Sequence, residues 1–161
     1  MVTALATIGC DHAAKHAAST LLAGAPDRSY LADTVRLGYL ENAGGFLSLG
    51  AAWPPASRTA VFTVMTGFAL LALIAVAFRG NYAGPSAVGL VLFVAGGLSN
   101  WIDRILRGSV VDFLNVGIGS LRTGVFNLAD VAIMLGAGLL ALEAFRRSGR
   151  AVHADDADWR R

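Results

Sequence analysis

The sequence predicts an all-α membrane protein, a bundle of four transmembrane helices with a small β-sheet on one membrane face. The first observation behind this prediction is composition: 55% of the 161 residues are hydrophobic and only 15% are charged, whereas soluble domains are about a quarter charged. The second is a set of long apolar runs. The length suits one domain, so we expect a single integral membrane domain over residues 1–161.

Three runs have the length of a membrane span. Residues 59–78 contain no charge, and Arg58 and Arg79 bracket them. Because a helix rises 1.5 Å per residue, about 20 residues cross a hydrocarbon core of ~30 Å. Residues 83–102 and 124–145 are the other two predicted spans. Both are rich in glycine, as expected where membrane helices pack closely.

The N-terminal segment predicts a fourth helix, over residues 2–23. Its apolar part before Asp11 gives only about 15 Å of helix, too short to cross alone, so Asp11 and Lys15 are expected at its outer end. A longer chain that begins upstream is an alternative. A cleaved signal peptide is a second alternative, but the absence of a positive charge at the start argues against it.

Short apolar runs separated by turn residues lie between the first two spans. Residues 34–42 and 44–50 predict two strands around a turn at 42–45, and hence a small sheet on one membrane face. Four spans place both termini on one side and the loops 24–57 and 103–123 on the other. The arginines that follow the last span favour a cytoplasmic C-terminus, so residues 146–161 are expected to form a cytoplasmic tail.

Two acids stand out in or beside the apolar runs, Asp112 and Asp130. Ionisable residues at membrane depth are costly and are functional candidates by default. On a helix, Asn100 shares a face with Asp103 and Arg104, and Asn127 shares one with Asp130. We expect the two carboxylates to meet at the outer membrane boundary.

Two adjacent carboxylates cannot both ionise cheaply, so they share a proton and titrate as a unit. The ionised partner can take a proton from water, and the protonated one can donate to a carbonyl oxygen. Such a pair hydrolyses a peptide bond without a metal or a cofactor, and none is expected here.

Other interpretations remain open for these residues. Asp112 could form a structural ion pair with Arg104 or Arg122, and Asp130 could cap a helix or pair with Asn127. A proton-coupled carrier could use Asp130 as a relay. A carrier, however, needs polar groups that reach both membrane faces, and here they gather on one side.

Several other functions find little support. His12 and His16 have the i, i+4 spacing of a zinc pair but lack the glutamate of a zincin motif. Lys15, the only lysine, has Ser19 alone as a helical neighbour for a Ser–Lys protease. No basic stripe indicates nucleic-acid binding, and the single Cys10 excludes an internal disulfide.

Five motifs occur in an order that resembles the lipoprotein signal peptidases (signal peptidase II), the bacterial membrane aspartic proteases. The last three, with their spacing, are the specific signal, while the N-terminal two are weaker. Ser99 stands where many members have glycine. The motifs are "DHAAK", "ENAGGFLSLG", "GGLSNWIDR", "GSVVDF" and "FNLAD".

The resemblance implies a role for each motif residue. Asp112 and Asp130 would be the catalytic dyad. Arg104 would hold substrate backbone carbonyls, Asp103 would hold Arg104 in place, and Asn127 would orient Asp130. The residues expected to support or line the substrate cleft are Asp11, Asn42, Asn100, Asp103, Arg104 and Asn127.

The resemblance also implies a substrate and a location. The substrate would be a prolipoprotein whose cysteine already carries diacylglycerol, cut just before that cysteine. The fold would be four transmembrane helices with a small extracytoplasmic β-cradle, and no cofactor. We expect a monomer in the bacterial inner membrane, in contact with lipid, with its active site near the extracytoplasmic face and its termini in the cytoplasm.

Overall fold

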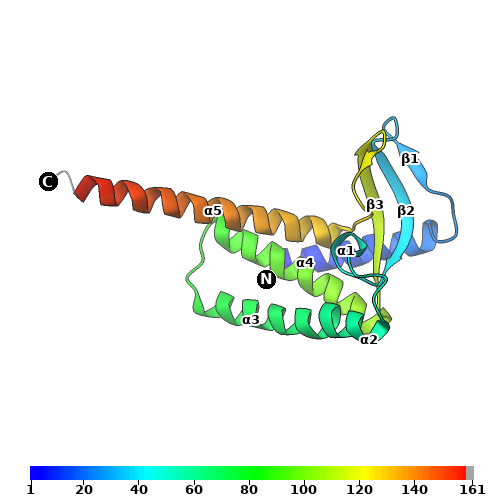
Figure 1. Ribbon diagram of the computed structural model, residues 1–161, viewed down its shortest axis with the longest axis horizontal. Coiled ribbons are helices and arrows are strands. Elements are labelled where there is room, and N and C mark those ends of the chain that lie inside the picture. Colours follow the sequence, from blue (N-terminus) through cyan, green and yellow to red (C-terminus); the bar gives the residue numbers. More distant parts are fainter. Residues whose placement is uncertain (159–161) are drawn as a thin grey trace.

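The computed structural model describes residues 1–158 and is mostly helical. Figure 1 shows an antiparallel sheet standing at one end of the helices, where α1 ends, α4 ends and α5 begins. The long helices therefore bring three of their ends to the sheet. The helices are α1 (Val2–Leu21), α2 (Pro55–Arg58), η2 (Thr59–Met65), α3 (Thr66–Arg79), α4 (Pro85–Arg107) and α5 (Leu128–Asp158).

Three helical segments are long and apolar enough to cross a membrane among the described residues. They are Pro55–Arg79 with 25 residues, Pro85–Arg107 with 23 and Leu128–Ser148 with 21. Helix α1 has 20 residues and confirms the predicted N-terminal helix. It is not among these three apolar segments, so its crossing of the membrane stays a prediction.

The first of these segments begins four residues before the predicted span. Pro55 occupies the first turn of α2, where its missing N–H and fixed φ cost nothing. The chain continues through the π-helical η2 into α3 without a break. Trp101 of α4 donates its indole N–H to the carbonyl oxygen of Thr63, 2.7 Å away, which ties α4 to η2.

Helices α4 and α5 approach closely through glycines. A Cβ on Gly136 would lie 2.5 Å from the carbonyl oxygen of Gly89, and a Cβ on Gly96 would lie 2.5 Å from that of Ala129. Larger side chains would push the two helices apart. This contact seats the last third of α4 against the first turn of α5.

The predicted limits of α5 need correction. The helix begins at Leu128 rather than at residue 124, because Asn127 caps it. It then continues to Asp158, so residues 146–158 of the expected tail are helical, and their cytoplasmic location stays a prediction. Residues 159–161 of that expected tail lie outside the described residues.

The sheet has four strands in the order β1-β2-β3-β4, all antiparallel neighbours. The predicted strand at 34–42 is confirmed as β2. The loop expected at 103–123 instead carries the last turn of α4 and two strands. The strands are β1 (Arg28–Tyr30), β2 (Val35–Asn42), β3 (Val110–Ile118) and β4 (Leu121–Arg122).

The second predicted strand, residues 44–50, is wrong. This segment forms a short 3-10 helix, Phe46–Ser48, between turns. Leu47 and Ser48 have positive φ angles of 53° and 62°, which a strand does not allow. Strand β2 pairs with β1 next to it in the sequence and with β3 about 70 residues away, so a long-range pairing joins the two local hairpins β1-β2 and β3-β4 into one sheet.

A small apolar core joins the sheet to the helices. Ala18 and Leu22, at the end of α1, pack with Val111 and Phe113 of β3. Because side chains alternate along a strand, Val111 and Phe113 face this cluster and Asp112 points to the other side. Core packing thus sets the direction of Asp112.

Candidate active site

Asp112 lies on β3 with only 1% of its surface exposed. Two asparagine amides bind it: Asn127 Nδ2 donates to Oδ1 over 2.6 Å, and Asn42 Nδ2 donates to Oδ2 over 2.8 Å. Asn42 ends β2, opposite Val110 in the register. Both oxygens of the Asp112 carboxyl therefore accept a hydrogen bond from a neutral donor.

Asp130 occupies the first turn of α5 and forms a capping box with Asn127. The Asp130 N–H donates to Asn127 Oδ1 at 3.0 Å, and the Asn127 N–H donates back to Asp130 Oδ2 at 3.2 Å. This reciprocal pair satisfies two backbone donors of the helix start. Asn127 is therefore the cap of α5 and not, as predicted, a residue on its face.

One bridge between strands brings Asn127 to Asp112. Leu114 of β3 pairs with Phe126, and the N–H of each donates to the carbonyl oxygen of the other over 2.8 Å. The next residue, Asn127, consequently lies beside Asp112. The Asn127 side chain binds the Asp112 carboxyl and its backbone N–H binds the Asp130 carboxyl, so one residue contacts both acids.

Asn100 of α4 binds the remaining oxygen of the Asp130 carboxyl. Its Nδ2 donates to Asp130 Oδ1 at 2.9 Å. Asn100 lies one turn after Gly96, whose close contact with Ala129 seats α4 against the start of α5. The glycine contact is therefore what brings this amide within reach of Asp130.

Behind Asn100 lies a buried ionic cluster centred on Lys15, which is 1% exposed. Its ammonium group lies 2.6 Å from Asp11 Oδ2 and 2.7 Å from Asp103 Oδ2, and it donates to Asn100 Oδ1 at 2.7 Å. His12 approaches the other oxygen of Asp103 at 3.7 Å. Two buried carboxylates thus share one buried ammonium.

Asp11 connects this cluster to the start of α5. Its Oδ1 accepts the N–H of Ala129 at 2.9 Å, and its Oδ2 accepts the hydroxyl of Ser99 at 2.7 Å. The free N–H groups of a helix start need such acceptors. Helices α1, α4 and α5 are therefore joined by one polar network at the level of Asp130.

The network fixes the orientation of all three amides. Lys15 can only donate, so it holds Asn100 Oδ1 and turns Nδ2 toward Asp130. The N–H of Gly44 holds Asn42 Oδ1 in the same way, and the N–H of Asp130 holds Asn127 Oδ1. Each NH₂ group is thereby presented to a carboxyl oxygen.

Arg104 holds the loop that follows β2. Its Nη2 donates to the carbonyl oxygen of Gly44 at 2.7 Å, and its Nη1 to that of Asn100 at 3.3 Å. Its Nε is buried, with no partner among the described residues. The prediction that Asp103 holds Arg104 in place is wrong, because the Asp103 carboxyl is engaged by Lys15.

Burial raises the pKa of Asp112 to about 6, and the nearby charge of Asp130 raises it further, while the amides of Asn42 and Asn127 oppose the shift. A carboxyl in this range exchanges its proton near neutral pH. That is the property required of one member of an acid–base pair.

A cavity of about 380 Å³ opens beside Asp130. Its walls are mostly apolar, with the polar groups of Asn100, Arg104 and Asp130 at one side. A ligand with a flexible apolar part and a polar bond to be held would fit such a lining. The apolar walls come from Gly45, Phe46, Phe62, Thr66, Gly97, Ile133, Met134 and Ala137.

The structure brings together every residue predicted for the site. It does not pair Asp112 with an arginine: Arg104 binds Gly44, and Arg122 donates to the carbonyl oxygen of Asp33 at 2.6 Å. The pairing of Asp130 with Asn127, an alternative interpretation of this acid, is present together with the other contacts. No group of three potential metal ligands occurs in the described part of the chain.

Sequence reasoning missed two members of the site, Lys15 and Ser99. Lys15 was treated as a residue of the helix end, although its i+4 spacing from Asp11 and its being the only lysine were available signals. Ser99 was noted only as a departure from the family. Its hydroxyl binds Asp11, a contact that no local pattern indicates.

Comparison with known families shows the family to which the chain belongs. The model of the family "Signal peptidase (SPase) II" matches residues 3–146. The chain belongs to the signal peptidase II family. The matched segment contains the two acids of the site, the three asparagines that bind them and the Lys15 cluster.

Named relatives of this signal peptidase II chain are lipoprotein signal peptidases. The protein of Burkholderia cenocepacia is 37% identical over 103 residues, 64% of this chain and 60% of that relative. The protein of Beijerinckia indica subsp. indica is 40% identical over 99 residues, 61% and 58% of the two chains. The aligned part thus spans about three fifths of these relatives.

Two solved structures share the fold. Both are bacterial membrane enzymes determined by the in meso method, at 2.3 Å and 1.9 Å resolution. The first has a TM-score of 0.79 and 23% identity, covering 92% of this chain and 88% of that one. The second has a TM-score of 0.75 and 24% identity, covering 89% and 90%. The similarity extends over the helices and the sheet together.

Proposed function

We propose that this signal peptidase II family member is an aspartic endopeptidase that removes signal peptides from diacylglyceryl-modified prolipoproteins. The cut falls just before the lipidated cysteine. One observation carries the proposal: Asn127 binds the buried carboxyls of Asp112 and Asp130 at the same time. The lipoprotein signal peptidase relatives supply the substrate class.

The two carboxyls act on a water molecule held between them. The ionised one takes a proton from the water as its oxygen attacks the scissile carbonyl carbon, and the protonated one donates to the carbonyl oxygen. The tetrahedral intermediate then collapses, and the leaving amide nitrogen receives a proton from the dyad. No covalent enzyme intermediate forms in this sequence.

The surrounding amides keep the dyad in place during these transfers. Asn42, Asn100 and Asn127 donate to the carboxyls and leave one lone pair of each oxygen free for water or substrate. Arg104 is the candidate for holding a substrate carbonyl, since its Nε has no partner in the described chain. The cavity beside Asp130 accommodates the apolar signal peptide.

The chain acts as a single integral membrane domain in the bacterial inner membrane. Helix α1 is the fourth span, with its buried charges neutralised by the Lys15 cluster rather than exposed to lipid. The sheet is the extracytoplasmic cradle and the termini are cytoplasmic. The enzyme works as a monomer, without a cofactor, and its partners are the lipidated precursor and membrane lipid.

Cleavage of a defined precursor tests the function. Purified protein in detergent is incubated with a prolipoprotein whose cysteine carries diacylglycerol, and mass spectrometry locates the cut. The matched control is the same precursor with that cysteine replaced by serine, which cannot be lipidated. Cleavage of only the modified precursor, directly before its cysteine, supports the proposal; cleavage of neither or of both contradicts it.

A further inference from the structure

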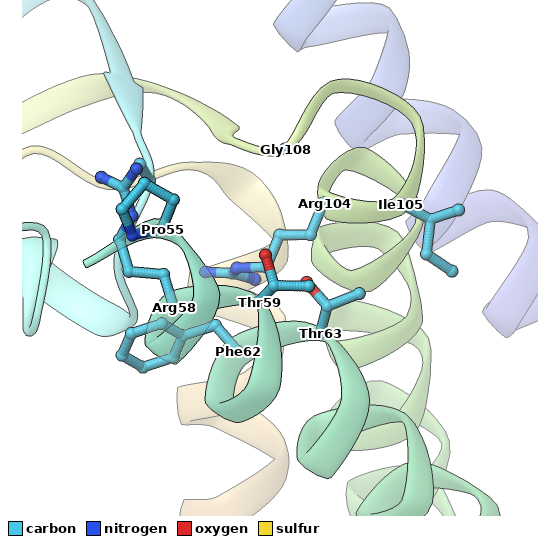
Figure 2. A pocket seen from close by; sticks show the side chains of 9 residues that line it. Pro55, Arg58, Thr59, Phe62, Thr63, Arg104, Ile105 and Gly108 are labelled. Carbon is cyan, nitrogen blue, oxygen red and sulfur yellow. The ribbon is translucent and has the colours of Figure 1, made fainter. Parts of the chain in front are cut away.

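A second cavity, of about 420 Å³, lies between the start of the Pro55–Arg79 segment and the end of α4. It is distinct from the cavity beside Asp130, although Arg104 and Phe62 form part of both linings. Figure 2 shows Arg58 and Thr59 on one side and Arg104, from α4, on the other, with the Arg104 guanidinium extending toward the α2 side.

Two arginine side chains, Arg58 and Arg104, line this cavity. It holds two guanidinium groups, and none of the lining residues in the described chain is acidic. Three of the ten N–H bonds of the two groups are engaged: Arg58 donates to the carbonyl oxygen of Ala51 at 2.9 Å, and Arg104 to those of Gly44 and Asn100. Guanidinium groups with free donors recognise phosphate, often through two parallel hydrogen bonds.

The depth of the cavity indicates where such a phosphate would come from. Pro55 starts one candidate span, and Gly108 directly follows another that ends at Arg107. The cavity therefore lies at the ends of two apolar segments, where lipid headgroups lie. On the same helices, Val64 and Met65 of η2 and Leu106 of α4 expose large apolar side chains, as contact with acyl chains requires.

We propose that this cavity binds the phosphate group of an anionic membrane phospholipid. Arg58 and Arg104 hold the phosphate oxygens, and Thr59 and Thr63 offer hydroxyl groups in the same lining. The acyl chains lie against the exposed apolar side chains of η2 and α4. This binding goes beyond the hydrolysis proposed above and does not require it.

Native mass spectrometry of the full-length protein tests the proposal. The protein is equilibrated in detergent with dioleoyl phosphatidylglycerol or dioleoyl phosphatidylcholine, and the retained lipid is quantified. We expect phosphatidylglycerol to be retained preferentially, and Arg58→Gln to reduce that preference about tenfold, as loss of a charge-assisted hydrogen bond predicts. Arg79→Gln, which removes the same charge at the other end of the same helical segment, should leave the preference unchanged.

A second pair of variants guards against misfolding of Arg58→Gln. Thr59→Glu places a carboxylate in the cavity and should abolish the preference, whereas Ala60→Glu, at an exposed neighbour that does not line the cavity, should retain it. Equal preference in all variants overturns the proposal, as does equal loss in the two members of a pair. Displacement of the lipid by millimolar inorganic phosphate overturns it as well, because a free anion would then be the ligand.

Discussion

Asn127 donates its side-chain N–H to Asp112 over 2.6 Å while the same residue caps the helix that carries Asp130. One side chain therefore sets the position of both acids. The acids lie on different kinds of structure, a strand and a helix start. Their mutual position depends on this asparagine more than on either element alone.

Replacing Asn127 by alanine should separate catalysis from binding. The variant loses the cap of α5, which costs about 1 kcal/mol of stability, and releases the Asp112 carboxyl. We expect kcat to fall by about 10²-fold or more, because small displacements of reacting groups are this costly, with little change in KM. Asn115→Ala, at a half-buried amide of the sheet that contacts neither acid, is the control. A rise in KM alone would mean that Asn127 binds substrate instead.

Replacing Lys15 by methionine should destabilise the protein strongly. It leaves Asp11 and Asp103 buried without their cation, a loss that typically costs about 3–5 kcal/mol. Thermal unfolding in detergent measures the effect, with Arg146→Met, at an exposed cation, as the control. Adding Asp103→Asn to the variant removes one unpaired charge and should recover part of the stability. A Lys15→Met protein that unfolds with the wild type would refute the role of the cluster.

Ser99→Ala removes one charge-assisted hydrogen bond to Asp11 without disturbing Lys15. The expected cost is about 1–2 kcal/mol of unfolding free energy, with cleavage activity close to wild type because Ser99 does not contact the dyad. Ser86→Ala provides a comparison, since the Ser86 hydroxyl binds only a neutral carbonyl oxygen and should cost less. If Ser99→Ala were the milder of the two, the hydroxyl would not be holding Asp11.

The raised pKa of Asp112 predicts a pH dependence of stability with a definite sign. The folded protein keeps this proton up to about pH 6, whereas the unfolded chain loses it near the ordinary pKa of an aspartate, 3.8. The native state binds more protons in this window, so stability falls as pH rises from about 4 to about 6 and is level above it.

The Asp112→Asn variant lacks that titration, and comparison with it isolates the group. Its stability relative to wild type should rise between pH 4 and pH 7 by up to about 3 kcal/mol, since one unit of pKa shift corresponds to ~1.4 kcal/mol. Thermal unfolding of both proteins across this range provides the measurement. Parallel curves would show that Asp112 titrates normally in the folded state.

The sequence predicted the helices well, because length and hydropathy are local properties. The predicted ranges 2–23 and 83–102 start within two residues of the observed starts of α1 and α4. The end of α4 was missed because Asp103, Arg104 and Arg107 looked like the start of a loop. In the structure, Lys15 neutralises Asp103 from another helix, and no local signal reports this.

The site residues were also identified from the sequence, but their arrangement was not. The spacing of Asn127 and Asp130 predicts a shared helix face. In the structure, Phe126 is bridged to Leu114 of β3, and the next residue, Asn127, caps α5. The segment 44–50 suggested a strand by alternation. Its conformation follows instead from contacts that Asn42 and Arg104 make with Gly44 and Gly45. The contact of Arg104 with Gly44 joins distant parts of the chain.

The proposed mechanism requires both Asp112 and Asp130, and a cleavage assay of variants at these two residues tests this requirement. Purified Asp112→Asn and Asp130→Asn proteins are given the diacylglyceryl-modified precursor beside wild type and Asp27→Asn, which alters an exposed acid. We predict that the first two stay folded, by size exclusion and circular dichroism, and release no signal peptide, whereas Asp27→Asn cleaves at the wild-type rate. Full cleavage by either Asp112→Asn or Asp130→Asn would contradict the dyad.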